Sequence, residues 1–121
     1  MKQANLTLRF LMEMASIFTF GIWGYSLSDN GNRIPLAILF PLLFALLWGI
    51  FAVKDDPSRS GKTVVRTPGA LRLLLELALF GSASCMLFEL GYTTAGWILG
   101  GLVILHYIIS FDRIRWLLKQ K

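Results

Sequence analysis

Two short stretches of the chain place an arginine and a glutamate four residues apart in strongly apolar surroundings. They are LRFLMEMA (8–15), which contains Arg9 and Glu13, and LRLLLELA (71–78), which contains Arg72 and Glu76. Residues four apart are neighbours on one face of a helix, so each pair can form an ion pair. Ionisable groups in apolar spans are rare and often mark proton or ion sites. These residues therefore offer either charge pairing or proton and cation binding.

Three interpretations of these pairs follow, of which inert peripheral charge is the simplest and the other two assign them a role. In the first of these two, they form a structural clamp between two helices, with Asp112 joining the network. In the second, Glu13 and Glu76 form a binding or proton-handling site. The residues stacked above them on the same helix faces lack polar side chains: Ile17, Phe20 and Gly24 above Glu13, and Phe80, Ala83 and Leu87 above Glu76. Neither column supplies the polar route that a proton or ion path needs, which favours the clamp.

His106 is a further ionisable candidate, in the middle of the last apolar segment. A buried, hydrogen-bonded histidine is favoured there over a proton relay. The single cysteine, Cys85, excludes a disulfide within the chain, and no zinc or haem spacing is present. We therefore expect no metal and no cofactor. No serine–histidine–acid set is visible either, so an enzyme is not expected.

Four apolar segments must position these residues. We expect helices over about 5–27, 34–53, 68–90 and 95–117, with a polar loop over about 54–67, in one domain spanning 1–121. Segment 34–53 carries no charge on any face, and the whole chain is 55 % hydrophobic and only 16 % charged. About 20 apolar helical residues cover roughly 30 Å, the hydrocarbon thickness of a bilayer. The sequence therefore predicts an all-α integral membrane four-helix bundle, in which strands are not favoured.

The basic residues lie almost entirely on one side of this arrangement. Only Arg33 lies on the other side, out of 12 lysines and arginines. The remaining eleven are Lys2, Arg9, Lys54, Arg59, Lys62, Arg66, Arg72, Arg113, Arg115, Lys119 and Lys121. The positive-inside rule then predicts a plasma-membrane protein with both termini and the 54–67 loop in the cytoplasm. The net charge of +5 belongs to this distribution, so it predicts contact with anionic lipid at the cytoplasmic face and no nucleic-acid binding.

The two opening stretches also indicate an internal duplication. The offset between Arg9 and Arg72 equals that between Glu13 and Glu76, 63 residues. This offset carries the segment 5–27 onto 68–90 and, with a weaker match, 34–53 onto 95–117. We infer two tandem two-helix repeats in the same orientation, with any pseudo-symmetry axis along the membrane normal.

With these residues, the chain resembles the YrdB-like family of small bacterial membrane proteins, which has no assigned activity. The resemblance rests on LRFLMEMA, on LLWGIFAV (46–53), on the proline-bearing basic loop and on LRLLLELALFG (71–81). The Trp48-Gly49-x-Phe51 element and the second Arg–Glu stretch are its most specific parts. The resemblance implies a four-helix protein of the bacterial plasma membrane and brings no catalytic residues with it.

Two hypotheses of function stay open at this point. The first is a structural or accessory protein that binds lipid or another membrane protein. The second is a small transporter or channel, a homodimer by analogy to the small multidrug exporters, with Glu13 and Glu76 as coupling carboxylates. Those exporters also have four helices in a little over a hundred residues and a glutamate in the first helix. The arginine before Glu13, the second glutamate and the lack of exporter motifs count against the second hypothesis.

Overall fold

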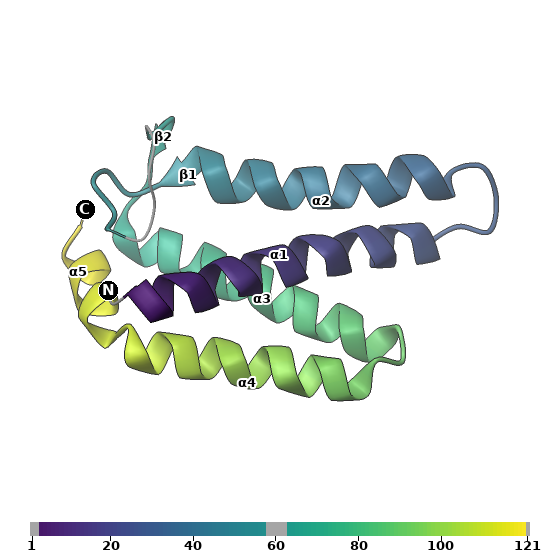
Figure 1. Cartoon of the computed structure of the whole chain (residues 1–121). Coiled ribbons are helices and arrows are strands. Elements are labelled where there is room, and N and C mark those ends of the chain that lie inside the picture. Colours follow the sequence, from purple (N-terminus) through teal and green to yellow (C-terminus); the bar gives the residue numbers. More distant parts are fainter. Residues whose placement is uncertain (1–2, 58–62, 121) are drawn as a thin grey trace.

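The chain folds into helices connected by short turns and one longer loop, and the computed structural model describes residues 3–57 and 63–120. The helices are α1 (Gln3–Ser26), α2 (Arg33–Ile50), α3 (Gly69–Glu89), α4 (Thr93–Ile109) and α5 (Phe111–Lys119), and the two-residue strands are β1 (Phe51–Ala52) and β2 (Val65–Arg66). α1 and α2 form one helical hairpin, and α3 and α4 form a second one (Figure 1). Apart from the four strand residues, the regular structure is helical, as the sequence predicts.

Several helices are suited to a lipid environment. α1, α2 and α3 are each long and apolar enough to cross a membrane, and α4 with α5 would make a fourth, broken span. α2 is the clearest case, because Phe44 is its single buried residue and large apolar side chains such as Ile34 and Ile38 are more than half exposed. A soluble monomer rarely exposes so much apolar surface, whereas lipid tails cover it without cost. The helices are therefore consistent with a membrane protein.

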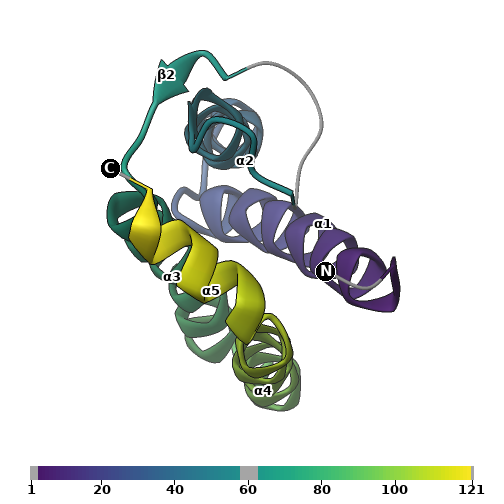
Figure 2. The ribbon, with the colours of Figure 1, turned by 90° about the vertical axis from the view of Figure 1, so that its left-hand side faces the viewer.

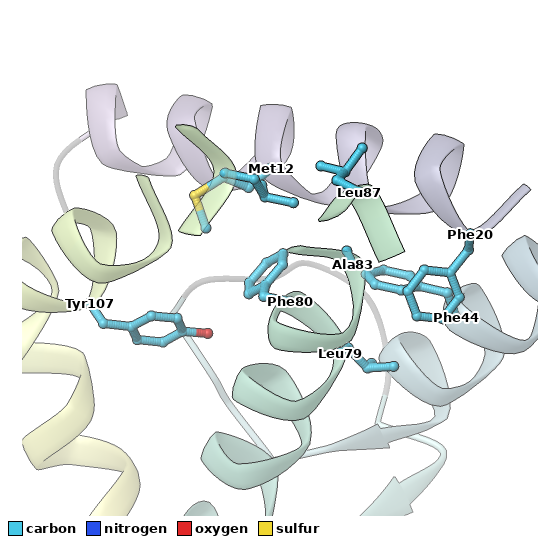
Figure 3. Close-up of a cluster of buried hydrophobic side chains, with 9 residues drawn as sticks. Met12, Phe20, Phe44, Leu79, Phe80, Ala83, Leu87 and Tyr107 are labelled. Atoms are coloured by element: carbon cyan, nitrogen blue, oxygen red, sulfur yellow. The ribbon is translucent and has the colours of Figure 1, made fainter. Parts of the chain in front are cut away.

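The apolar core lies where the long helices meet. Nine buried side chains form it: Met12, Phe20, Phe44, Leu79, Phe80, Ala83, Leu87, Leu99 and Tyr107 (Figure 3). Aromatic rings run through this cluster, with ring centroids 5.1 Å apart for Phe20 and Phe44 and 6.4 Å apart for Phe80 and Tyr107. Such pairs add about 0.5–1.5 kcal/mol each beyond simple burial. The column Phe80, Ala83 and Leu87 is buried and apolar, as its sequence indicates.

α3 and α4 are joined by a tight turn whose geometry follows from one glycine. Gly91 adopts a φ of 88°, a left-handed conformation that L side chains rarely take. The Gly91 amide donates to the Phe88 carbonyl at 3.1 Å, and the Tyr92 amide donates to the Leu87 carbonyl at 2.8 Å. These two bonds form a Schellman motif, which satisfies the last carbonyls of α3. α4 can therefore begin two residues later, antiparallel to α3.

The chain between α2 and α3 differs from the predicted one. α2 ends at Ile50 rather than near residue 53, because Phe51 and Ala52 become extended and pair in parallel with Val65 and Arg66. The Thr67 amide adds a hydrogen bond to the Ala52 carbonyl at 2.9 Å. The sequence does not favour strands, and this short pair is a correction to that prediction. It holds the end of α2 beside the start of α3.

The prediction of one helix over 95–117 also needs correction. α4 ends at Ile109, α5 begins at Phe111, and the two helices are bent by 70° at Ser110. Figure 2 shows α5 crossing the end of α3. A straight helix would carry Arg113 and Leu117 away from α3, whereas the bend buries both of them. The bend is therefore what brings the end of the chain back to the charged residues of α3.

The described basic residues separate as the sequence predicts between the two ends of the molecule. The end that carries both termini, β1 and β2 also carries Lys54, Arg66, Arg115 and Lys119, whereas Arg33 opens α2 at the opposite end (Figure 1). Lys2, Arg59, Lys62 and Lys121 lie outside the described residues. The end with the termini is called the basic end below.

Candidate functional site: a buried charge cluster

Glu76 is the centre of a cluster of charged side chains near the basic end. It lies seven residues into α3, about 10 Å along the helix, and its side chain is fully buried. Its Oε1 accepts hydrogen bonds from Arg9 Nη1 at 3.1 Å, Tyr107 Oη at 2.6 Å and Arg113 Nη1 at 2.9 Å. Its Oε2 accepts from Arg72 Nε and Arg113 Nη2, both at 2.7 Å. A carboxylate offers about four lone-pair positions, so these donors leave no free acceptor on Glu76.

Arg113 of α5 holds two carboxylates with one guanidinium. Besides Glu76, it contacts Asp56, with Nε 3.0 Å from Oδ1 and Nη2 2.6 Å from Oδ2. The planar fork of arginine suits such bidentate contacts, which are among the stronger hydrogen bonds in proteins. Asp56 follows a turn in which Asp55 adopts a φ of 63°, so that Asp55 is exposed and Asp56 is buried. Arg113 therefore ties α5 both to α3 and to the segment after β1.

Arg72 connects the cluster to the end of α2. Its Nη1 donates to the Trp48 carbonyl at 2.6 Å and to the Phe51 carbonyl at 2.5 Å. Carbonyls at a helix C-terminus lack partners within the helix, and a cation there also interacts well with the helix dipole. The Trp48 ring adds a cation–π contact, with its centroid 4.6 Å from Arg72 Cζ and 4.8 Å from Arg9 Cζ. Arg72 therefore caps α2 while it pairs with Glu76.

His106 belongs to a chain of hydrogen bonds that extends from Arg9. Its Nε2 lies 3.4 Å from Arg9 Nη1, and because a guanidinium only donates, Nε2 is the acceptor. Nδ1 then carries the proton and donates to Asn5 Oδ1 at 2.7 Å, and Asn5 Nδ2 donates to Ser110 Oγ. His106 and Ser110 are fully buried. His106 is therefore a buried, hydrogen-bonded histidine, as its sequence position favours, and this pattern of donors and acceptors corresponds to the neutral ring.

Glu13 lies at the edge of the cluster and is bound much less firmly than Glu76. Its side chain is 20 % exposed, and its Oε1 is 3.5 Å from Arg9 Nε, too long for a good hydrogen bond. Arg9 instead directs its terminal nitrogens to Glu76, with Nη2 2.9 Å from Oε2. The two Arg–Glu pairs of the sequence are therefore not equivalent in the structure.

Among residues 3–57 and 63–120, the formal charges of the cluster cancel. Its three guanidiniums belong to Arg9, Arg72 and Arg113, and its three carboxylates belong to Glu13, Asp56 and Glu76. An unpaired buried charge costs several kcal/mol, which this pairing avoids. Phe80 and Met12 belong to the apolar core, and the Phe80 ring centroid lies 6.4 Å from that of Tyr107, which donates to Glu76. The arrangement can hold helices together. Beyond it, the buried face of α3 continues with the apolar Phe80, Ala83 and Leu87, whereas the buried face of α1 also carries the hydroxyl side chains of Ser16 and Thr19.

The structure brings most of the predicted site residues together. Arg9, Glu13, Arg72, Glu76 and His106 all belong to the cluster. Asp112, which was expected to join it, has an exposed side chain on α5, and the neighbouring Arg113 reaches Glu76 in its place. Within residues 3–57 and 63–120, no group of three or more histidine, cysteine or acidic side chains could hold a metal ion.

Six described members of the cluster were missed by reasoning from the sequence. They are Asn5, Trp48, Asp56, Tyr107 and Arg113, and Ser110 at the end of the hydrogen-bond chain. Asn5 precedes Arg9 by four residues, so helical spacing places both on one face and could have identified it. Arg113 and Asp56 carried no such signal, because their contact depends on the bend at Ser110 and on the turn after β1.

The fold and the site thus define the class of protein. It is a small helical protein whose apolar helices are long enough to cross a membrane and are joined near one end by buried ion pairs. Residues 7–104 match the family described as "Protein of unknown function (DUF2568)", and the chain belongs to this family. It is 40 % identical over 121 residues to the "Uncharacterized protein YrdB" of Bacillus subtilis (strain 168), covering 99 % of this chain and 98 % of that protein. No solved structure matches the chain. The resemblance to the YrdB-like family is thereby confirmed, and neither name assigns an activity.

Proposed function

We propose that this protein is a multi-pass protein of the plasma membrane with a structural or accessory role, in which the charge cluster acts as a clamp. The observation that carries the proposal is the complete occupation of Glu76 by donors from three arginines and a tyrosine. Through these donors one carboxylate joins α1, α3, α4 and α5. Arg72 and Arg113 add the end of α2 and the segment after β1.

A coupling carboxylate in a transporter has different requirements. It must release and rebind a proton or a substrate cation, so it needs a free lone pair and access to water on at least one side. Glu76 is fully buried, and its acceptor positions are filled. Phe80, Ala83 and Leu87 continue its face of α3 as a buried apolar column. These features support a fixed structural anion.

The expected topology completes this proposal. Both termini and the loop around 54–67 lie in the cytoplasm, and the four spans form a bundle of two tandem two-helix units. The grouping of Lys54, Arg66, Arg115 and Lys119 at the basic end supports this orientation. The partners are anionic lipid at the cytoplasmic surface and either another membrane protein or a second copy of the chain. No nucleic acid and no enzymatic reaction are part of the proposal.

A small dimeric transporter or channel is the second candidate, and the state of Glu13 is the observation that favours it. Glu13 is partly exposed and its contact with Arg9 is long. It keeps acceptor capacity that Glu76 lacks. In this alternative Glu13 would be the main coupling carboxylate, and Glu76 would fix the arginine beside it.

Proton flux separates the two candidates. The purified full chain is reconstituted into liposomes that contain a pH-sensitive dye, and a pH gradient is imposed with and without candidate cationic solutes outside. The clamp predicts the same decay of the gradient as in protein-free liposomes. Solute-dependent flux that is lost in Glu13→Gln, with the protein still folded, would establish the transporter and refute the clamp as the main role.

A further inference from the structure

A small polar cavity opens at the basic end beside the charge cluster. It has a volume of about 170 Å³, and it lies where the segment after β1, the segment after β2 and the end of α5 meet. Its lining consists of Val53, Lys54, Arg66, Thr67, Pro68 and Gln120. One water occupies about 30 Å³ in the liquid, so the cavity has room for a polar group of several non-hydrogen atoms.

Backbone hydrogen bonds fix the walls of this cavity. β1 and β2 pair in parallel, and the Thr67 amide donates to the Ala52 carbonyl at 2.9 Å. On the other side, the Gly69 amide donates to the Gln120 carbonyl, also at 2.9 Å. The backbone segments around the cavity are therefore held in place by the fold.

The lining is basic and uncompensated. Lys54 and Arg66 both line the cavity, and none of its described lining residues is acidic. Within residues 3–57 and 63–120, neither of these two cations pairs with a carboxylate, in contrast to Arg113, which binds two. An ammonium and a guanidinium only donate hydrogen bonds, so the group that suits this cavity is an anion with several acceptor oxygens.

The position of the cavity just beyond the end of α2 corresponds to the level of the lipid headgroups. α2 has 18 residues and is therefore about 27 Å long, close to the thickness of the hydrocarbon core. Lys54 follows its last residue, Ile50, by four positions. Exposed apolar side chains flank the cavity segments, with Val64 72 % and Val65 42 % exposed. Such side chains suit contact with a lipid surface better than contact with free water.

We propose that this cavity binds the anionic phosphate group of a phospholipid headgroup, with Lys54 and Arg66 donating to its oxygens. The proposal rests on the proposed membrane topology, since it needs the basic end to lie at a bilayer surface. It goes further by assigning one bound lipid to a defined cavity, beyond the general attraction of a basic surface for anionic lipid.

Lipid binding by the detergent-purified full chain tests this assignment. Native mass spectrometry measures the affinity for phosphatidylglycerol and for phosphatidylcholine, whose anionic phosphate is offset by a choline cation that Lys54 and Arg66 would repel. The double variant Lys54→Gln with Arg66→Gln is compared with Arg115→Gln with Lys119→Gln, which removes the same charge from α5 at the same end. We expect the cavity variant to lose about 30-fold in affinity for the anionic lipid. The α5 variant should lose less than about threefold, because neither Arg115 nor Lys119 lines the cavity.

Each outcome decides the assignment. Equal losses in the two double variants would mean a diffuse electrostatic surface and would overturn the cavity, as would equal binding of the two lipids. Displacement of the lipid by millimolar inorganic phosphate at constant ionic strength would keep the phosphate chemistry and change its source to a soluble ligand. None of these readouts involves proton flux, so the lipid site can fail while the clamp stands, and the reverse also holds. Unchanged thermal stability of both double variants shows that they remain folded.

Discussion

Replacing Glu76 by glutamine is the most direct test of the clamp. Glutamine has nearly the same shape, so the substitution removes the charge and one acceptor without opening a cavity. Three guanidiniums then remain buried, with Glu13 and Asp56 as their carboxylates. The amide nitrogen of glutamine is also a donor. It would face one of the arginine or tyrosine donors that now donate hydrogen bonds to Glu76, so two donors would meet without an acceptor.

The expected magnitude follows from the burial of the group. Removing one partner of a buried ion pair costs about 3–5 kcal/mol, because the remaining charge is left without compensation. Since 1 kcal/mol corresponds to at least about 2 °C in melting temperature for a chain of this size, Glu76→Gln should lower the apparent Tm by at least about 6 °C. The measurement is thermal unfolding in one detergent, followed by circular dichroism or by intrinsic tryptophan fluorescence.

Glu13→Gln is the matched control, because it makes the same chemical change one helix away. Its side chain is partly exposed and its ion contact is long, so we expect a loss of no more than about 1 kcal/mol. The double variant Glu76→Gln with Arg113→Gln should be less destabilised than the sum of the two single variants, since the two side chains contact each other. A Glu76→Gln protein that unfolds within about 2 °C of the wild type would refute the clamp, and so would equal effects at positions 13 and 76.

Three further outcomes are expected. Gly69→Ala should displace α5, because a Cβ atom at residue 69 would lie 1.6 Å from the Leu117 carbonyl oxygen. Gly81→Ala in the same helix is the control, since a Cβ atom there would have nothing within 4 Å and should change stability by no more than about 1 kcal/mol. Thermal unfolding of both variants is the measurement. Arg113→Gln should speed amide hydrogen exchange across α5 more than across α1, because α5 loses its contacts with both Glu76 and Asp56. An equal increase in the exchange rates of α5 and α1 would contradict this. Trp48→Leu should cost about 1–4 kcal/mol through two lost cation–π contacts, and an unchanged Tm would show that the indole ring only fills space.

The helical class and most helix positions could be predicted from the sequence, because long uncharged segments allow few alternatives. Segment 34–53 has no polar face, so a helix in lipid was the expected solution, and α2 covers most of it. The break at Ser110 could not be predicted in this way. Residues 95–117 carry no proline and no internal polar run before Asp112, and the bend depends on contacts that Arg113 and Leu117 make with α3. Such contacts lie outside any local sequence rule.

The candidate site could be predicted only for residues that lie four apart on the same helix. The four-residue spacing of Arg9 with Glu13 and of Arg72 with Glu76 placed these residues on the correct faces. Their pairing was only partly foreseeable, because the strongest contact of Arg9 is with Glu76 on another helix and not with Glu13 on its own. A local pattern cannot rank partners across helices when their relative depth is unknown.

On the proposed membrane topology, the buried cluster has a physical role that differs from that of an ion pair in a soluble core. In water, apolar burial drives helices together, and a buried ion pair adds little because desolvation offsets its attraction. In a bilayer the lipid tails are as apolar as the helix faces, so packing and polar contacts must select the arrangement. α2 illustrates this point, since its apolar face contributes one buried residue, Phe44, while Arg72 holds its C-terminal carbonyls. Glu76 accepts from donors on α1, α3, α4 and α5, so on the proposed topology it would fix the register of these helices, whereas the same charge would be a weak stabiliser in a soluble core.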